Sequence, residues 1–265
     1  MSAMPLGKVA PLGPGGTGIS SGGLGSPHTK RAGDTVPVTV HQLVAVASQD
    51  RLLAGTLVPA EAPCGAGVLL VHGLGSSRAT NVERAEAVAR HHASTCLAID
   101  LGGHGDSTGR LSEMTPRQNL ADVVAAYDTL ASLPQVDPAR IGVCAASYGA
   151  YLSVLLTAHR PVNRMLLRAP ALYADDCFDR GLALRRAGDR TTAPTPLAHL
   201  ALFPGAVTIV ESERDEVISP DTIAAYLAAL PSASHLVLPG AQHALTDPAW
   251  RAAFERIVVE SFAGL

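Results

Sequence analysis

The chain has 265 residues, of which 47% are hydrophobic, so it is long enough to bury one large core. Its 20 basic and 23 acidic side chains give a formal net charge of −3, and this lack of a basic excess argues against a nucleic-acid partner. No apolar run approaches the roughly 20 residues that a membrane span needs. The four cysteines, Cys64, Cys96, Cys144 and Cys177, have no Cys-x-x-Cys spacing, which favours a reducing compartment.

The first segment, about Met1 to Asp34, is dense in Gly, Pro and Ser and has almost no large apolar residues. Such a composition does not offset the entropy of ordering, so we expect a disordered tail followed by one domain over residues 35–265. The tail lacks the basic start and continuous apolar stretch of a signal peptide, which predicts a cytoplasmic protein.

Beyond the tail, short apolar runs alternate with amphipathic segments. Residues 36–47 and 52–58 are expected to form an antiparallel hairpin. Further strands are expected over residues 67–71, 95–99, 141–146, 162–168, 207–210 and 234–238, and helices over 81–92, 116–133, 148–159, 220–230 and 248–262. This alternation predicts an α/β fold, with a mostly parallel twisted sheet of about eight strands and helices on both faces. The less regular stretch of about 170–205 is expected to form a short lid insertion.

The segment Ile141–Ala150 predicts a buried strand that turns directly into a helix at Ser147. So tight a turn needs small residues two positions to either side of the serine, and Ala145 and Gly149 meet this need. The hydroxyl of Ser147 then lies at a helix N-terminus, where backbone N–H groups favour developing negative charge. This is the arrangement that a nucleophilic serine requires.

A serine hydroxyl needs a general base, and the active groups of an open parallel sheet gather at the carboxyl ends of its strands. Three histidines directly follow predicted strands: His72, His104 and His243. His243, between the last strand and the last helix, is the expected base. His72 is expected to brace its loop, and His104 to be structural. A metal site of His72, His104 and Asp100 is a much less favoured alternative.

The acid that orients the imidazole should follow the preceding strand, where four acidic side chains compete. Asp215 is the expected acid because an apolar pair follows it and the helix start at Ser219-Pro220 anchors its loop. The remaining three are interpreted as a solvated acidic loop (Glu211, Glu213 and Glu216). Asp175 and Asp176 are weaker alternatives for the acid.

Four segments in chain order resemble motifs of the α/β-hydrolase superfamily: His72-Gly73, Asp100–Ser107, Ala145–Gly149, and Asp215 with His243. Over about residues 36–265 the chain is similar to the small bacterial serine esterases and S9 or S33 peptidase-like members of that superfamily. Two positions depart from the motifs, because Ala145 stands where a glycine is usual and Gly102 where an arginine is usual.

The oxyanion of a tetrahedral intermediate needs two N–H donors. One is expected from the backbone of Tyr148, the residue after Ser147. The resemblance implies the second, because in hydrolases the residue after His-Gly supplies it, and that residue is Leu74 here.

These features predict a serine hydrolase of the carboxylesterase type, acting on small-molecule esters through an acyl-enzyme. Ser147, His243 and Asp215 would form its catalytic triad, and no cofactor or metal is needed. Peptide or amide cleavage ranks second, because no propeller or large lid domain is present to sieve peptides. A binding protein on a hydrolase scaffold ranks third, because all three triad residues are present. The leucines of residues 172–204 either line an acyl or alcohol pocket or cover the edge of the sheet.

Overall fold

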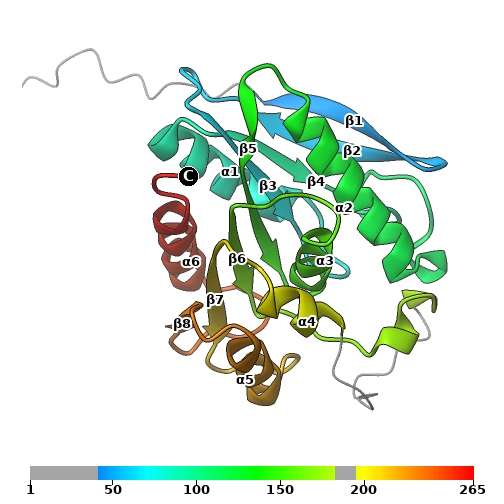
Figure 1. The fold of residues 1–265 in the computed structure, drawn as a ribbon, viewed down its shortest axis with the longest axis vertical. Helices are drawn as coiled ribbons and strands as arrows, with labels where there is room; N and C mark the ends of the chain where they lie inside the picture. Colours follow the sequence, from blue (N-terminus) through cyan, green and yellow to red (C-terminus); the bar gives the residue numbers. More distant parts are fainter. Residues whose placement is uncertain (1–40, 183–194) are drawn as a thin grey trace, which may run out of the picture. The chain divides into compact units, whose positions relative to one another are not determined.

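The computed structural model describes residues 41–182 and 195–265, and one eight-stranded sheet organises them (Figure 1). The strands are β1 (Gln42–Ser48), β2 (Arg51–Val58), β3 (Gly65–Val71), β4 (Thr95–Ile99), β5 (Val136–Ala146), β6 (Arg164–Arg168), β7 (Ala206–Ser212) and β8 (Ser234–Leu238). The helices are α1 (Ala79–His92), α2 (Pro116–Ala131), α3 (Tyr148–Leu156), α4 (Thr195–Ala201), α5 (Pro220–Ala229) and α6 (Pro248–Ser261). The predicted disordered tail, the domain start at residue 35 and part of the lid insertion lie outside the described residues.

The strand order is β1-β2-β4-β3-β5-β6-β7-β8. β2 pairs antiparallel with both β1 and β4, and every other neighbouring pair is parallel. The prediction of a mostly parallel α/β sheet of about eight strands is therefore confirmed. The order reverses between β3 and β5, and ligands of open α/β sheets bind beyond the carboxyl ends of the strands at such a point.

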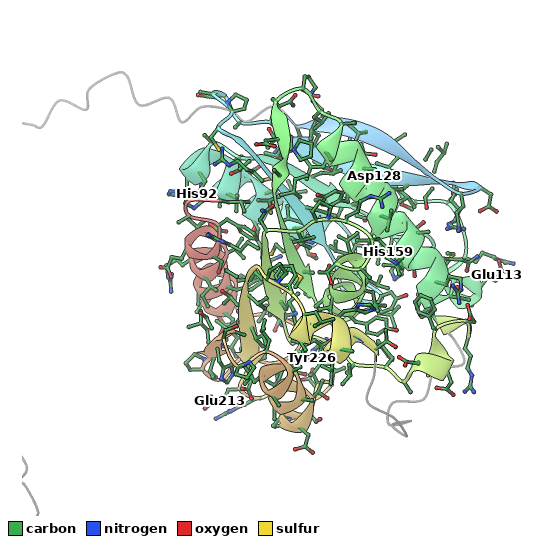
Figure 2. The ribbon with its side chains drawn as sticks, viewed as in Figure 1. His92, Glu113, Asp128, His159, Glu213 and Tyr226 are labelled. Carbon is green, nitrogen blue, oxygen red and sulfur yellow. The ribbon has the colours of Figure 1, made fainter. Side chains whose placement is uncertain are left out.

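Helices cover both faces of the sheet, and side chains fill the space between each helix layer and the strands (Figure 2). Alternate residues of a strand point to opposite faces, so β3 serves two cores. Leu69 and Val71 pack on the side of α2 and α3, whereas Val68 and Leu70 pack on the side of α1 and α6. Because both faces are covered, β3, β4 and the second half of β5, from Ile141, are apolar without alternation, which is the pattern that predicted them. The first half of β5, which the sequence pattern did not predict, is polar and mostly exposed.

Three helices begin at a proline that follows a capping residue, as the sequence indicates. The capping pairs are Thr115-Pro116 at α2, Ser219-Pro220 at α5 and Asp247-Pro248 at α6, and each capping side chain accepts a hydrogen bond from a backbone N–H of the first turn. The helix α4 and the 3-10 turns at Leu111–Glu113 and Asp175–Cys177 were not predicted, since each is only one or two turns long.

Candidate active site

Ser147 lies at the turn between β5 and α3, at the carboxyl edge of the sheet. Its backbone has φ 51° and ψ −117°, a strained conformation that non-glycine residues keep only when their surroundings hold them there. The N–H of Ser147 donates to the carbonyl of Arg168 at 2.9 Å, and Gly149 packs against the end of β3. A Cβ on Gly149 would lie 2.4 Å from the carbonyl oxygen of His72, so only glycine fits. The predicted strand–turn–helix around Ser147 is thus confirmed.

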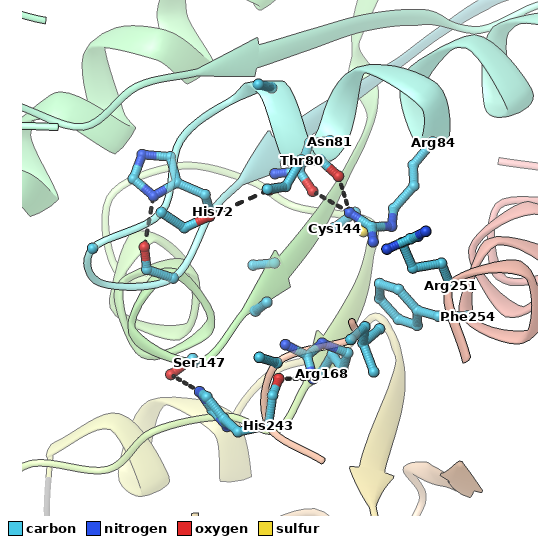
Figure 3. A pocket seen from close by; sticks show the side chains of 18 of the residues that line it. His72, Thr80, Asn81, Arg84, Cys144, Ser147, Arg168, His243, Arg251 and Phe254 are labelled. Atoms are coloured by element: carbon cyan, nitrogen blue, oxygen red, sulfur yellow. Dashed lines mark hydrogen bonds between the residues drawn. The ribbon is translucent and has the colours of Figure 1, made fainter. Parts of the chain in front are cut away.

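The structure brings Ser147, His243 and Asp215 into one chain of hydrogen bonds (Figure 3 shows the first). Nε2 of His243 lies 3.1 Å from Oγ of Ser147, and Nδ1 lies 3.0 and 2.8 Å from the two carboxylate oxygens of Asp215. These partners imply the tautomer in which Nδ1–H donates to Asp215 and Nε2 accepts from the serine hydroxyl. An imidazole in this state accepts the proton of an attacking hydroxyl.

The carboxylate of Asp215 is buried and well satisfied. Its side chain is 5% exposed, and its Oδ1 accepts from the N–H groups of Val217 (2.9 Å) and Ile218 (2.8 Å). Burial disfavours the charged carboxylate, but the hydrogen bonds from His243, Ile218 and Val217 outweigh burial and lower the pKa of Asp215. Asp215 therefore stays ionised at neutral pH and holds the imidazole in one orientation.

The alternative acids bind elsewhere. Asp175 accepts hydrogen bonds from the N–H and the hydroxyl of Thr195, and Asp176 pairs with Arg180 at 2.8 Å. Neither aspartate hydrogen-bonds to the imidazole of His243, so of the three candidate acids only Asp215 contacts it.

The neighbouring glutamates form a solvated loop in part, since Glu213 and Glu216 are exposed and Glu211 is half-buried, but all three also bind neighbouring groups. Their carboxylates accept hydrogen bonds from the ring of His235 (Glu211, 2.9 Å), the N–H of Gly240 (Glu213, 2.6 Å) and the N–H of His243 (Glu216, 3.2 Å). The loop after β7 therefore holds the loop that carries His243 in place, through backbone groups that the sequence pattern does not reveal.

The loop after β3 lies beside Ser147. A Cβ on Gly73 would lie 3.2 Å from Cβ of Ser147, so the loop passes close to the serine. Among the described residues, no acceptor takes the backbone N–H of Leu74, whose side chain is 42% exposed. Tyr148, the first residue of α3, has a fully buried ring whose hydroxyl donates to Oδ1 of Asn119 at 3.0 Å. Both expected oxyanion donors thus belong to segments that flank the serine.

His72 braces its own loop, in agreement with the geometry expected for it. Its Nδ1 lies 2.7 Å from the carbonyl oxygen of Gly73, and its Nε2 accepts from the N–H of Leu101 at 3.1 Å. Burial lowers the pKa of His72 to about 4, so the ring is neutral and both nitrogens are used within the protein. The ring of His104 lies 4.9 Å from that of His72, and burial lowers its pKa too. No cluster suited to a metal ion occurs among the described residues.

The turn Asp100–Ser107 is stabilised by buried carboxylates. Asp100 is fully buried and accepts from the backbone N–H and the guanidinium of Arg78 and from the N–H of Asp106. Next to it, a Cβ on Gly102 would meet Oδ2 of Asp122 at 2.8 Å and Nε of Arg51 at 3.0 Å. A guanidinium from β2 therefore fills the space beside Gly102, at the position where the family motif has an arginine.

A pocket of about 660 Å³ opens beside Ser147. Its walls come from the loop after β3, the start of α1, the ends of β5 and β6, the loop of His243, and α6, and they carry Arg84, Arg168 and Arg251 (Figure 3). The sequence pattern did not indicate that these three arginines share a pocket. The one available signal was Arg168, a charge that ends the buried strand β6.

In the leucine-rich segment after β6, the residues that the structure describes do not line this pocket. Leu182, Leu200 and Phe203 are buried in the core on the α2–α3 side, and Leu197 packs against it. These described residues help to cover the sheet, in agreement with the second of the two expectations. Leu184 lies outside the described residues.

The strand order, the strained serine after β5 and the histidine after β8 define the α/β-hydrolase fold. Solved structures share it. The esterase PF2001 of Pyrococcus furiosus is 17% identical with a TM-score of 0.67, covering 84% of this chain and 90% of its own. Est1E of Butyrivibrio proteoclasticus, solved with ferulic acid, is 16% identical with a TM-score of 0.67, covering 82% of this chain and 96% of its own. An acylaminoacyl peptidase of Pyrococcus horikoshii is 16% identical with a TM-score of 0.69, covering 86% of this chain and 42% of its own.

The sequence comparisons agree with this fold. Residues 62–187 match the model of the serine aminopeptidase family S33, which agrees with the α/β-hydrolase fold of the sheet. An uncharacterised protein of Mycobacterium tuberculosis is 37% identical over 131 residues, which are 48% of this chain. The matched region spans 44% of that relative's length. Within the described residues, no helix is both long and apolar enough to span a bilayer.

Proposed function

We propose that the protein is a serine carboxylesterase of small-molecule esters, with Ser147 as nucleophile, His243 as base and Asp215 as the orienting acid. The observation that carries the proposal is the pair of contacts on one imidazole: 3.1 Å to the serine hydroxyl and 2.8 Å to the carboxylate. Nucleophile, base and orienting group within hydrogen-bond reach of one another are the geometric signature of covalent acyl transfer.

The reaction proceeds in two halves. As Oγ of Ser147 adds to the acyl carbon, Nε2 of His243 takes its proton, and the backbone N–H groups of Leu74 and Tyr148 receive the oxyanion. Collapse of the intermediate expels the alcohol, which takes the proton back from His243 and leaves an acyl group on Ser147. Water then attacks the acyl group with His243 as base, which regenerates the serine. No cofactor or metal takes part in these steps.

Aminopeptidase activity is the second candidate, because the matched family model is named for it. An aminopeptidase must bind the ammonium group of a peptide N-terminus, for which carboxylates are suited. The pocket beside Ser147 instead carries three arginines and one exposed glutamate, Glu83. This charge disfavours an ammonium group, so ester cleavage ranks first.

Active-site labelling and turnover together test the proposal. Wild type should react with a fluorophosphonate probe and hydrolyse short p-nitrophenyl esters, and Ser147→Ala should lose both. Ser132→Ala, which removes an exposed hydroxyl at the end of α2, is the control and should keep both. An unlabelled, inactive wild type would favour a scaffold role, and faster cleavage of aminoacyl anilides than of esters would favour the peptidase.

A further inference from the structure

The pocket beside Ser147 carries an unusual charge for a chain with a net charge of −3. Three of its lining residues are arginines, contributed by α1, β6 and α6. Among the described residues, none of these three guanidinium groups forms an ion pair with a carboxylate. Arg51, Arg78, Arg117 and Arg160, by contrast, each pair with an aspartate.

Arg84 reaches into the pocket from α1. Its Nη1 donates to the carbonyl of Thr80 and to Oδ1 of Asn81, and its guanidinium lies 5.0 Å from the ring centroid of Phe254. Its Nε is buried and has no hydrogen-bond partner among the described residues. Leaving a buried donor of a charged group unpaired is costly, so the position is suited to an incoming acceptor.

Arg168 ends β6 directly beside the loop of His243. Its side chain is nearly buried, and its Nη1 donates to Oγ of Ser212 (3.2 Å) and to the carbonyl of His243 (3.0 Å). The described residues accept no hydrogen bond from its Nε or Nη2. The negative charge of Asp215 favours the charged form of Arg168, but the Asp215 carboxylate is already bound to the imidazole of His243.

Arg84 is disfavoured as a cation by Arg251, and Arg168 by Arg84. Burial, followed by the neighbouring charge of Arg84, lowers the pKa of Arg168 to about 10. Burial also lowers the pKa of Arg84, and Arg251 acts in the same direction, although Cys144, Glu255 and Glu83 oppose it. Like charges gathered in one partly buried pocket are destabilising on their own, and a bound anion relieves that repulsion.

We infer that Arg84, Arg168 and Arg251 form an anion subsite next to Ser147, and that the preferred substrates are esters that carry a carboxylate or phosphate group. Guanidinium groups offer forked donors that fit the oxygens of such groups. The pocket volume of about 660 Å³ suits a small molecule rather than a polymer. The inference rests on the proposed esterase function and adds the chemical class of the substrate.

Two pairs of esters test the subsite. Mono-p-nitrophenyl glutarate and p-nitrophenyl valerate have the same leaving group and acyl chain length and differ in the terminal carboxylate. The second pair, 4-carboxyphenyl acetate and phenyl acetate, places the carboxylate in the leaving group. For each protein the measured quantity is the ratio of kcat/KM for the anionic to that for the neutral ester, so incomplete folding of a variant cancels.

Removing one pocket charge should lower the ratio in the pair whose carboxylate reaches the subsite. We expect about a tenfold fall in Arg84→Met and in Arg251→Met, which is the usual scale for losing a hydrogen bond to a charged group. Arg84→Lys should recover part of the loss. Arg90→Met, an exposed change on the same helix, should leave both ratios as in wild type. Ratios that stay within about twofold of wild type in both pocket variants would overturn the subsite, while continued ester turnover would leave the esterase proposal intact.

A binding measurement tests the subsite without catalysis. Glutarate or inorganic phosphate should raise the Tm of the Ser147→Ala protein, and Arg84→Met in that background should reduce the rise. The anion with the larger effect identifies carboxylate or phosphate as the natural group. If neither anion raises the Tm more than the neutral analogue valeramide does, the inference fails even if the protein proves not to be an esterase.

Discussion

Replacing Asp122 by alanine should destabilise the fold strongly, although Asp122 lies on a helix and its carboxylate does not bind Ser147 or His243. The carboxylate is fully buried and accepts four hydrogen bonds, from Oγ of Ser48 (2.5 Å), Nη2 of Arg51 (3.0 Å), the N–H of Gly102 (2.9 Å) and Nδ2 of Asn119 (2.9 Å). It therefore joins the β1–β2 hairpin, the turn after β4 and α2 at one point.

The loss in the free energy of unfolding is set by the buried donors that remain without an acceptor in the alanine variant. Breaking a buried ion pair by removing one partner costs about 3–5 kcal/mol. Arg51 keeps contacts with Asp50 and Gln49, which places the ion-pair loss near the lower end, but three neutral donors also lose their acceptor. We expect a loss of about 4 kcal/mol in the free energy of unfolding, which is roughly a 10 °C fall in Tm for a domain of this size.

Urea unfolding followed by circular dichroism, with Asp128→Ala as the matched control, measures this difference. Asp128 lies on the same helix and also pairs with an arginine, Arg160, but its side chain is 48% exposed. An exposed pair contributes about 0–1 kcal/mol, so the control should lose little. Equal losses in the two variants would refute the argument that burial of the carboxylate, rather than ion pairing as such, sets its contribution.

Two further changes probe the surroundings of Ser147. The pKa of His72 falls from 6.5 to about 4 on folding, because burial favours the neutral ring. The folded state is therefore fully stabilised by the neutral ring above pH 6.5, and this contribution to the free energy of unfolding is lost as the pH falls toward 4. Wild type should therefore lose about 2 kcal/mol more than His72→Asn between pH 7 and pH 5 in urea unfolding, and parallel pH dependences would contradict the assignment. Gly149→Ala places a Cβ 2.4 Å from a backbone oxygen and should lower the free energy of unfolding by about 3 kcal/mol and remove most of the proposed esterase activity. Gly264→Ala, with open space around it, should cost only about 1 kcal/mol, and equal losses in the two variants would count against the steric argument.

The sequence predicted the sheet and the convergence of Ser147, Asp215 and His243 because both depend on local signals. Strands buried on both faces are continuous apolar runs, and each motif residue follows such a run directly. The fold then brings Ser147, Asp215 and His243 together, since the carboxyl ends of parallel strands share one edge. The small residues Ala145 and Gly149 indicated the turn, and at Gly149 the structure gives the reason, because a Cβ there would collide with the carbonyl oxygen of His72.

What the sequence did not predict depends on long-range register and helix phase. Arg84 and Arg251 lie on α1 and α6, far apart in the chain, and only the packing of both helices on the same face brings them to one pocket. The side chains that fill the space beside Gly102 are equally distant in the chain, because Arg51 comes from the hairpin and Asp122 from α2. The glutamates after β7 bind backbone N–H groups, which leave no mark in the pattern of side chains.

Arg168 belongs both to the proposed anion subsite and to the surroundings of Ser147 and His243, so a change at Arg168 does not separate substrate preference from catalysis. Its guanidinium donates to the carbonyl of His243, and its own carbonyl accepts from the N–H of Ser147, so it contacts both sides of the hydrogen bond on which the proposed chemistry depends. Changing its side chain therefore alters the position of the imidazole as well as the charge of the pocket. An anion bound at Arg168 would in turn lie next to the loop of His243, so binding of the proposed substrate would be coupled to the position of the imidazole through this one residue. Arg84 and Arg251 contact neither Ser147 nor His243, and for that reason they, rather than Arg168, separate substrate preference from catalysis.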